Sequence, residues 1–157
     1  MTPGTPRRPR AVALLCAVLL SVLTACGGSK EKAEGDGFSA AADLTTCQGD
    51  ATAAAKPYGE HFPSDWPFPA RTVVFHAEER EGGGTIVTAV SSTGFKDILA
   101  FMNRSVAGAG FATVKGETEE HDAEAEWRGN GFHGRWSIRE SASCDGETVI
   151  QVLSATG

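Results

Sequence analysis

Apolar and polar positions in the second half of the chain follow the two periods that distinguish strands from helices. Residues 72–78 and 85–91 are both rich in β-branched and aromatic side chains, which favour extended structure. The acidic, Gly-rich stretch 79–84 joins them over a short distance. We therefore expect these two segments to form a β-hairpin.

A single amphipathic helix is predicted after this hairpin. Its apolar positions recur at the spacing of one helix face, and they are Phe95, Ile98, Leu99, Met102 and Val106. This spacing gives the helix one apolar stripe, which is suited to packing on a sheet. Ser92 or Thr93 is expected to cap the start of the helix, and Gly108 or Gly110 to end it.

The Asn130-Gly131 pair predicts a second hairpin, because Asn-Gly is the strongest short-range signal for a two-residue type I′ turn. That turn fixes which residues face each other. On one side large residues meet small ones, in the pairs Trp127–Gly134, Ala125–Trp136 and Ala123–Ile138. On the other side acids meet arginines and favour cross-strand pairing, in the pairs Glu126–Arg135 and Asp122–Arg139. The apolar side, joined by Phe132, is expected to receive the helix, and the charged side to face water.

Two further strands complete the predicted fold. Residues 111–116 follow the helix as a short strand, and residues 147–153 form the last strand. Together the elements predict an α+β domain over residues 71–157, in the order ββαββββ. We expect a mainly antiparallel sheet of about five or six strands, with the amphipathic helix packed on one face.

Residues 38–70 show no sustained period and hold a proline cluster. Pro63, Pro67 and Pro69 exclude a central strand and break any helix. We expect an irregular arm whose large aromatic residues lie against the domain. These residues are Phe62, Trp66 and Phe68.

Residues 1–25 have the layout of a secretory signal peptide. A basic segment with Arg7, Arg8 and Arg10 precedes an uncharged, largely apolar run over residues 11–25. As a helix this run spans about 22 Å, which is less than the roughly 30 Å hydrocarbon core of a bilayer. A cleaved signal peptide is therefore favoured over a permanent transmembrane helix.

The end of this segment, Leu23-Thr24-Ala25-Cys26, resembles the lipobox of bacterial lipoproteins, in which a branched apolar residue and two small residues precede an invariant cysteine. The resemblance implies that Cys26 receives a diacylglyceryl thioether and becomes the N-terminus after cleavage. Residues 26–37 then serve as lipid anchor and flexible tether, because they contain no large apolar residue. An ordinary signal peptide with an unrelated cysteine near the cleavage site is the alternative.

A lipid on Cys26 implies a place in the cell envelope. The membrane itself becomes a partner, since two or more acyl chains suffice to hold a protein to a bilayer. We expect the outer face of the cytoplasmic membrane, or the outer membrane in a two-membrane cell. Cleavage removes three arginines and no acid, so the formal net charge of −6 becomes −9. Such an acidic chain argues against non-specific binding of nucleic acid.

The four cysteines acquire different roles after this processing. Cys16 leaves with the signal peptide and Cys26 is lipidated, so Cys47 and Cys144 remain in the exported domain. Two thiols in an oxidising compartment have one possible pairing, which predicts a Cys47–Cys144 disulfide. The alternative is a zinc site, although the close Cys-x-x-Cys spacing typical of zinc ligands is missing.

The exported domain shows a second, looser resemblance. Residues 95–102, followed by Ala109-Gly110-Phe111 and a meander, are similar to small α+β domains of uncharacterised actinobacterial-type lipoproteins. The similar region covers residues 57–153. It implies a fold and an envelope location, and no activity.

Candidate chemistry is sparse. The sequence contains no nucleophile-elbow, zincin, penicillin-binding or nucleotide-binding motif. His61, near Asp65, can line a pocket in the arm, but a surface or capping histidine is the favoured interpretation. His121 and the acidic residues 117–126 offer ligands for Ca²⁺ but lack the Asp-x-Asp-x-Asp-Gly order of calcium loops. We interpret the acidic run as a solvated hairpin, and the tryptophans as core residues.

These observations favour a membrane-anchored extracytoplasmic lipoprotein with a small, non-catalytic binding or interaction domain. Its partner is an envelope protein or a small ligand, and no cofactor is expected. One alternative is a small envelope enzyme or metal-binding protein that uses His61, His121 and nearby carboxylates. Another alternative is an accessory subunit of an envelope complex.

Overall fold

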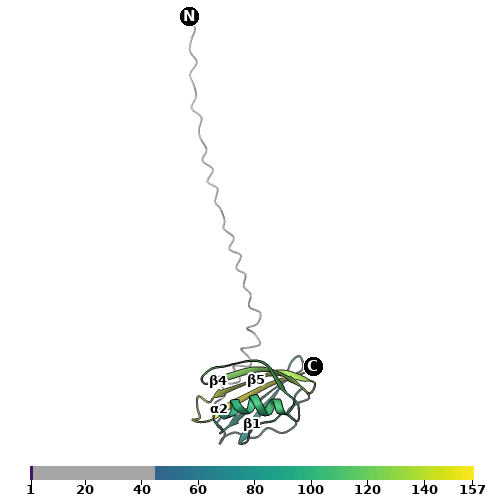
Figure 1. Cartoon of the computed structure of the whole chain (residues 1–157), viewed down its shortest axis with the longest axis vertical. Coiled ribbons are helices and arrows are strands. Elements are labelled where there is room, and N and C mark those ends of the chain that lie inside the picture. The colour runs from purple at the N-terminus through teal and green to yellow at the C-terminus, as the bar shows by residue number, and fades with distance from the viewer. Residues whose placement is uncertain (2–44) are drawn as a thin grey trace.

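The computed structural model describes Met1 and residues 45–157 of the chain. The predicted signal peptide (1–25), the tether with Cys26 (26–37) and residues 38–44 of the arm lie outside the described residues. Figure 1 shows the described part as a layer of strands with α2 lying across it. The elements are β1 (Thr72–Arg80), β2 (Gly84–Ser91), α2 (Phe95–Phe101), η1 (Met102–Val106), β3 (Ala112–Thr118), β4 (Asp122–Gly129), β5 (Phe132–Glu140) and β6 (Thr148–Thr156).

The six strands form one antiparallel sheet in the order β1-β2-β6-β5-β4-β3. This confirms the predicted α+β fold and the ββαββββ element order. The strands from β3 to β6 form a meander, and β6 then pairs with β2 near the middle of the sheet. The helical segment α2–η1 carries the chain from β2 to the far edge of the sheet, where β3 lies.

The predicted register of the β4–β5 hairpin is confirmed. Trp127 lies opposite Gly134, and Ala125 lies opposite Trp136. The turn residues Asn130 and Gly131 both have positive φ, at 52° and 81°, as a type I′ turn requires. The apolar side of the hairpin is buried in the main core, as predicted.

The helix buries its predicted stripe but begins and ends differently from the prediction. Gly94 is the N-cap and no side chain caps it, so the expectation of Ser92 or Thr93 is wrong. The Thr93 hydroxyl instead lies within hydrogen-bonding distance of Arg71 and Ala70, which removes it from the helix terminus. Gly110 follows the helix with a φ of 95°, in agreement with its predicted role.

The last turn of the helix is widened, which the periodicity did not predict. Residues 102–106 form the π-helical turn η1. Met102 and Val106 nevertheless stay buried, so the apolar stripe continues through the wider turn. Met102 and Val106 are four positions apart, which is the spacing of an α-helix, so the sequence pattern gives no sign of the wider turn.

Strand boundaries differ from the predictions by a few residues. β1 and β2 extend into the predicted connection, which shortens to residues 81–83. The predicted strand 111–116 begins one residue late, at Ala112, because Phe111 is turned fully into the core. β6 continues past its predicted end to Thr156.

The arm packs against the domain through its aromatic residues, as predicted. Phe62 and Trp66 are buried members of the main core, and Phe68 is partly buried against it. The ring centroids of Trp66 and Trp127 lie 4.5 Å apart, and those of Trp66 and Phe111 lie 5.0 Å apart. The arm therefore closes the core on the helix side of the sheet instead of extending into solvent.

Gly134 is required by backbone packing in the middle of β5. A Cβ atom added there would overlap the backbone carbonyl oxygen of Leu153 on β6. We expect Gly134→Ala to lower the free energy of unfolding by about 2 kcal/mol or more, because strands must shift to admit the methyl group. Urea denaturation of the purified protein measures this loss. Gly108→Ala is the matched control, since no atom lies within 4 Å of its added Cβ. Equal stability of the two variants would contradict the packing argument.

Candidate functional site

The two histidines singled out in the sequence make separate local contacts. His61 Nδ1 lies 3.4 Å from Thr156 Oγ1, whereas Asp65 accepts a hydrogen bond from Asn130 at 3.1 Å. His121 Nδ1 lies 2.8 Å from a carboxylate oxygen of Glu140. No hydrogen bond joins His61 to Asp65 in the described part of the chain, so their proximity in sequence does not make a pair.

The contacts of the two histidines place them at opposite ends of β5. Thr156, beside His61, pairs with Phe132 at the first residue of that strand. Glu140, beside His121, is its last residue. Eight strand steps separate these ends, which corresponds to about 27 Å. The structure therefore does not bring His61 and His121 into one site.

The acidic residues 117–126 are spread over an exposed hairpin. Every residue of β3 is exposed, and Glu117 lies opposite Glu124 on β4. Glu124 forms an ion pair with Arg135 on the next strand. Within residues 45–157, these carboxylates do not converge into a group of three potential metal ligands.

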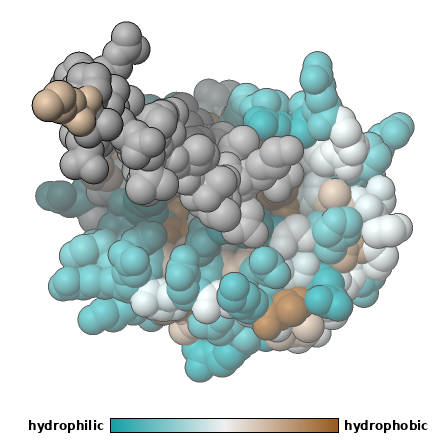
Figure 2. All heavy atoms as spheres, turned by 90° about the horizontal axis from the view of Figure 1, so that it is seen from above, coloured by the Kyte–Doolittle hydropathy of each residue, from teal (hydrophilic) through white to brown (hydrophobic). Residues whose placement is uncertain are grey.

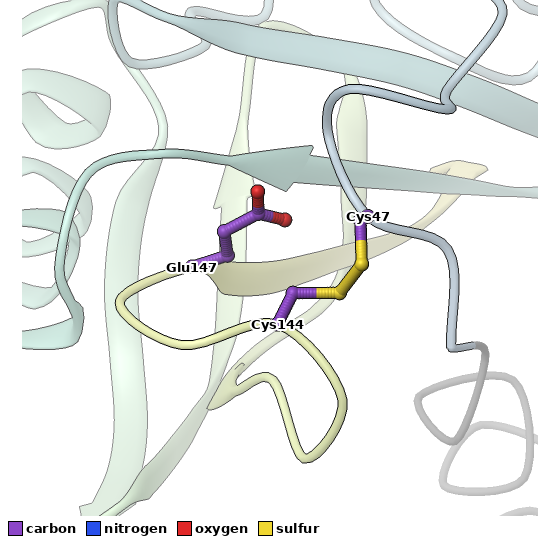
Figure 3. A group of neighbouring side chains, drawn as sticks. All are labelled: Cys47, Cys144 and Glu147. Carbon is purple, nitrogen blue, oxygen red and sulfur yellow. A yellow bond between two sulfur atoms is a disulfide. The ribbon is translucent and has the colours of Figure 1, made fainter.

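Three potential ligand side chains do lie close together, and they are Cys47, Cys144 and Glu147. The two cysteines are joined by a disulfide bond. Figure 3 shows the disulfide between Cys47 and Cys144, with Glu147 beside it. The Glu147 carboxylate accepts a hydrogen bond from the backbone N–H of Gln48 at 2.8 Å. The predicted disulfide is confirmed, and it ties the arm to the β5–β6 loop. Because the two sulfur atoms are bonded to each other, the described residues hold no zinc-ligating thiolate pair here.

The tryptophans are core residues, as interpreted from the sequence. Trp66, Trp127 and Trp136 are all buried, and none of their indole N–H groups has a hydrogen-bond partner in the described part. Tyr58 meets Phe62 edge-on at 5.8 Å, and burial raises the pKa of its phenol. These rings form packing surface and do not form an exposed platform for a sugar or peptide.

The face of the sheet opposite α2, here called the outer face, carries the charged side chains of β4 and β5. Along β4 the buried residues alternate with exposed or half-buried charged ones. Two adjoining hollows lie on this face and share Glu126. The larger, of about 380 Å³, is lined by Val114, Glu126, Trp127, Arg128, His133 and Gly134. The smaller, of about 190 Å³, is lined by Lys115, Gly116, Glu117, Glu124, Ala125, Glu126 and Arg135. We call the two together the outer-face groove.

Charges of both signs line the outer-face groove in cross-strand rows. Glu126 lies opposite Arg135 on β5, as the hairpin register predicts, and opposite Lys115 on β3, a pairing that was not predicted. Arg135 forms an ion pair with Glu124, its diagonal neighbour on β4. Diagonal neighbours lie within reach of long side chains, so register alone does not settle which acid an arginine selects.

Sequence reasoning did not single out the larger hollow. The predicted register already places Arg128 opposite His133, and that pairing was the available signal. Nothing in the sequence predicted that Val114 lines the larger hollow, because it reaches the hollow through a bulge between Thr113 and Lys115. A bulge depends on the fit of two strands and leaves no pattern in either one.

The face in Figure 2 is covered mostly by hydrophilic residues, with small apolar spots outside the grey atoms. Among the described residues, no helix is long and apolar enough to cross a membrane.

Searches with this chain found no matching family model, no similar curated protein and no similar solved structure.

Proposed function

We propose that this protein is a bacterial lipoprotein, anchored through a diacylglyceryl group on Cys26 to the outer face of the cytoplasmic membrane. Its small domain is non-catalytic and binds a ligand or an envelope protein. The sequence Leu23-Thr24-Ala25-Cys26 at the end of a signal-peptide pattern carries this proposal. The second acyl chain that such proteins carry makes anchoring stable, where a single chain holds only weakly.

The disulfide supports an extracytoplasmic location. Disulfides form and persist in oxidising compartments and are rare where glutathione or thioredoxin keeps thiols reduced. Cys144 is only 7% exposed, and the bond joins segments 97 positions apart. A bond of this kind is a structural staple, which suits a small domain outside the cytoplasm.

Binding is favoured over catalysis because the described residues assemble no acid–base or nucleophile pair in a cleft. The two candidate histidines lie at opposite ends of β5, and the sulfur atoms of Cys47 and Cys144 are bonded to each other. The outer-face groove instead combines charges of both signs in hollows that are open to solvent. Such a lining can recognise a polar ligand without reacting with it.

Replacing Cys26 with Ala should abolish lipidation, because the thioether has no other sulfur to form on at the cleavage site. Cells grown with a labelled fatty acid should incorporate label into the parent protein and essentially none into Cys26→Ala. The parent protein should also partition into the detergent phase on phase separation. Cys16→Ala, within the apolar run, is the matched control and should keep both properties. Persistent label on Cys26→Ala would refute the anchor.

A further inference from the structure

Arg128 and His133 form an unusual pair on the wall of the larger hollow. They lie directly opposite each other across β4 and β5, and both are exposed. Neither side chain has a hydrogen bond or ion pair within residues 45–157, whereas the Arg135 side chain on the same face pairs with Glu124. The Arg128 guanidinium keeps its charge and its five N–H donors at any ordinary pH. An anion is therefore the group that this pair lacks.

An exposed apolar side chain lines the same hollow as Arg128 and His133. Val114 is 47% exposed, and no other large apolar side chain among residues 45–157 is classed as exposed. It reaches the hollow through the β3 bulge, and bulges re-aim side chains beside binding sites. Exposure of one apolar residue here means that a ligand can gain contact area by covering it.

Glu126 and the smaller hollow determine what a ligand must offer besides an anion and an apolar group. Glu126 lines both hollows, so its carboxylate lies between Arg128 and the part of the groove that holds Lys115 and Glu117. A carboxylate at this position accepts hydrogen bonds from N–H groups and repels a ligand with two negative charges. The smaller hollow extends the groove beyond a single residue's length along β4.

We propose that the outer-face groove binds the C-terminus of an extended peptide that ends in an apolar residue. The terminal carboxylate pairs with the Arg128 guanidinium beside His133. The terminal side chain covers Val114, a backbone N–H donates to Glu126, and the preceding residues lie along the smaller hollow. Carboxylate, apolar group and N–H occur together in this order at a peptide C-terminus, whereas phosphate offers neither of the last two. The inference deepens the proposed binding function by naming a ligand class.

The test uses the full-length protein in detergent micelles and the tripeptide Ala-Ala-Leu. Binding is followed by amide shifts at Val114, Arg128 and Gly134 in NMR spectra. We expect C-terminal amidation of the peptide, or Arg128→Ala, to weaken binding about tenfold or more, because each removes a charge-assisted hydrogen bond. Arg128→Lys should restore part of the affinity, as a point charge without the bidentate fork.

Matched controls separate recognition from folding and from general anion binding. Lys96→Ala, on α2, removes a cation from the other side of the sheet and should leave binding unchanged. Val114→Thr keeps the side-chain shape and should weaken Ala-Ala-Leu more than Ala-Ala-Gly. The proposal is overturned if the amidated peptide binds as well as the acid, or if leucine or inorganic phosphate binds as tightly. Fatty-acid labelling at Cys26 does not depend on the peptide, so failure here leaves the anchor unaffected.

Discussion

The double substitution Cys47→Ser/Cys144→Ser should remove a large part of the stability of this domain. The disulfide closes a loop of about a hundred residues, for which the chain-entropy model gives about 4.7 kcal/mol. Small domains are stable by only about 5–15 kcal/mol, so the reduced chain should unfold at a much lower urea concentration. Equilibrium denaturation of the purified protein, with matched baselines, measures this difference.

Non-additivity of the two cysteine substitutions provides the internal control. Each single substitution breaks the same bond, so each should cost nearly as much as the double substitution. Glu147→Gln should cost far less, because it weakens one hydrogen bond to the Gln48 N–H and leaves the covalent link intact. Single effects that simply add up to the double would show that the cysteines act through something other than their bond.

Trp127→Ala is expected to cost about 3–5 kcal/mol, as is usual for truncating a buried aromatic residue in a core that collapses only partially. Trp127 is 1% exposed, and its ring contacts those of Trp66 in the arm and Phe111 before β3. Its removal therefore opens the contact between arm and sheet as well as the core below it. Urea denaturation and near-ultraviolet circular dichroism together report the loss of stability and of ring packing.

Two comparison variants make the Trp127 result specific. Trp127→Phe keeps a ring in place and removes an indole N–H that has no hydrogen-bond partner, so we expect a clearly smaller loss than for alanine. Trp66→Ala combined with Trp127→Ala should cost less than the sum of the two, because their rings touch. Strict additivity would mean that the arm does not pack on β4 in solution.

The β4–β5 hairpin shows how much the sequence can predict when two local signals agree. Asn130-Gly131 fixes a turn, and the turn fixes every opposing pair along the strands. The large–small pairs and the acid–arginine pairs then support the same register independently. The resulting prediction was confirmed residue by residue, and it already contained the Arg128–His133 pairing.

The helix start shows where local reasoning failed. Ser92 and Thr93 are good capping residues by type, and the chain has the right order for a cap. In the folded protein the Thr93 hydroxyl forms hydrogen bonds elsewhere, with the Arg71 guanidinium and the backbone carbonyl of Ala70. Residues about twenty positions away compete with the helix terminus for this hydroxyl, and a prediction from local residue preferences does not include them.

The sequence by itself determined which segments form strands and which forms the helix, the hairpin register, the ββαββββ order and the one pairing open to Cys47 and Cys144. These features follow from period, turn chemistry and elimination, which are local or nearly local properties. Only the tertiary structure decided that His61 and His121 lie apart, that Val114 reaches the outer face through a bulge, and that Gly134 must lack a side chain. Those outcomes depend on how distant strands fit together, and the energy of such contacts is absent from any single segment.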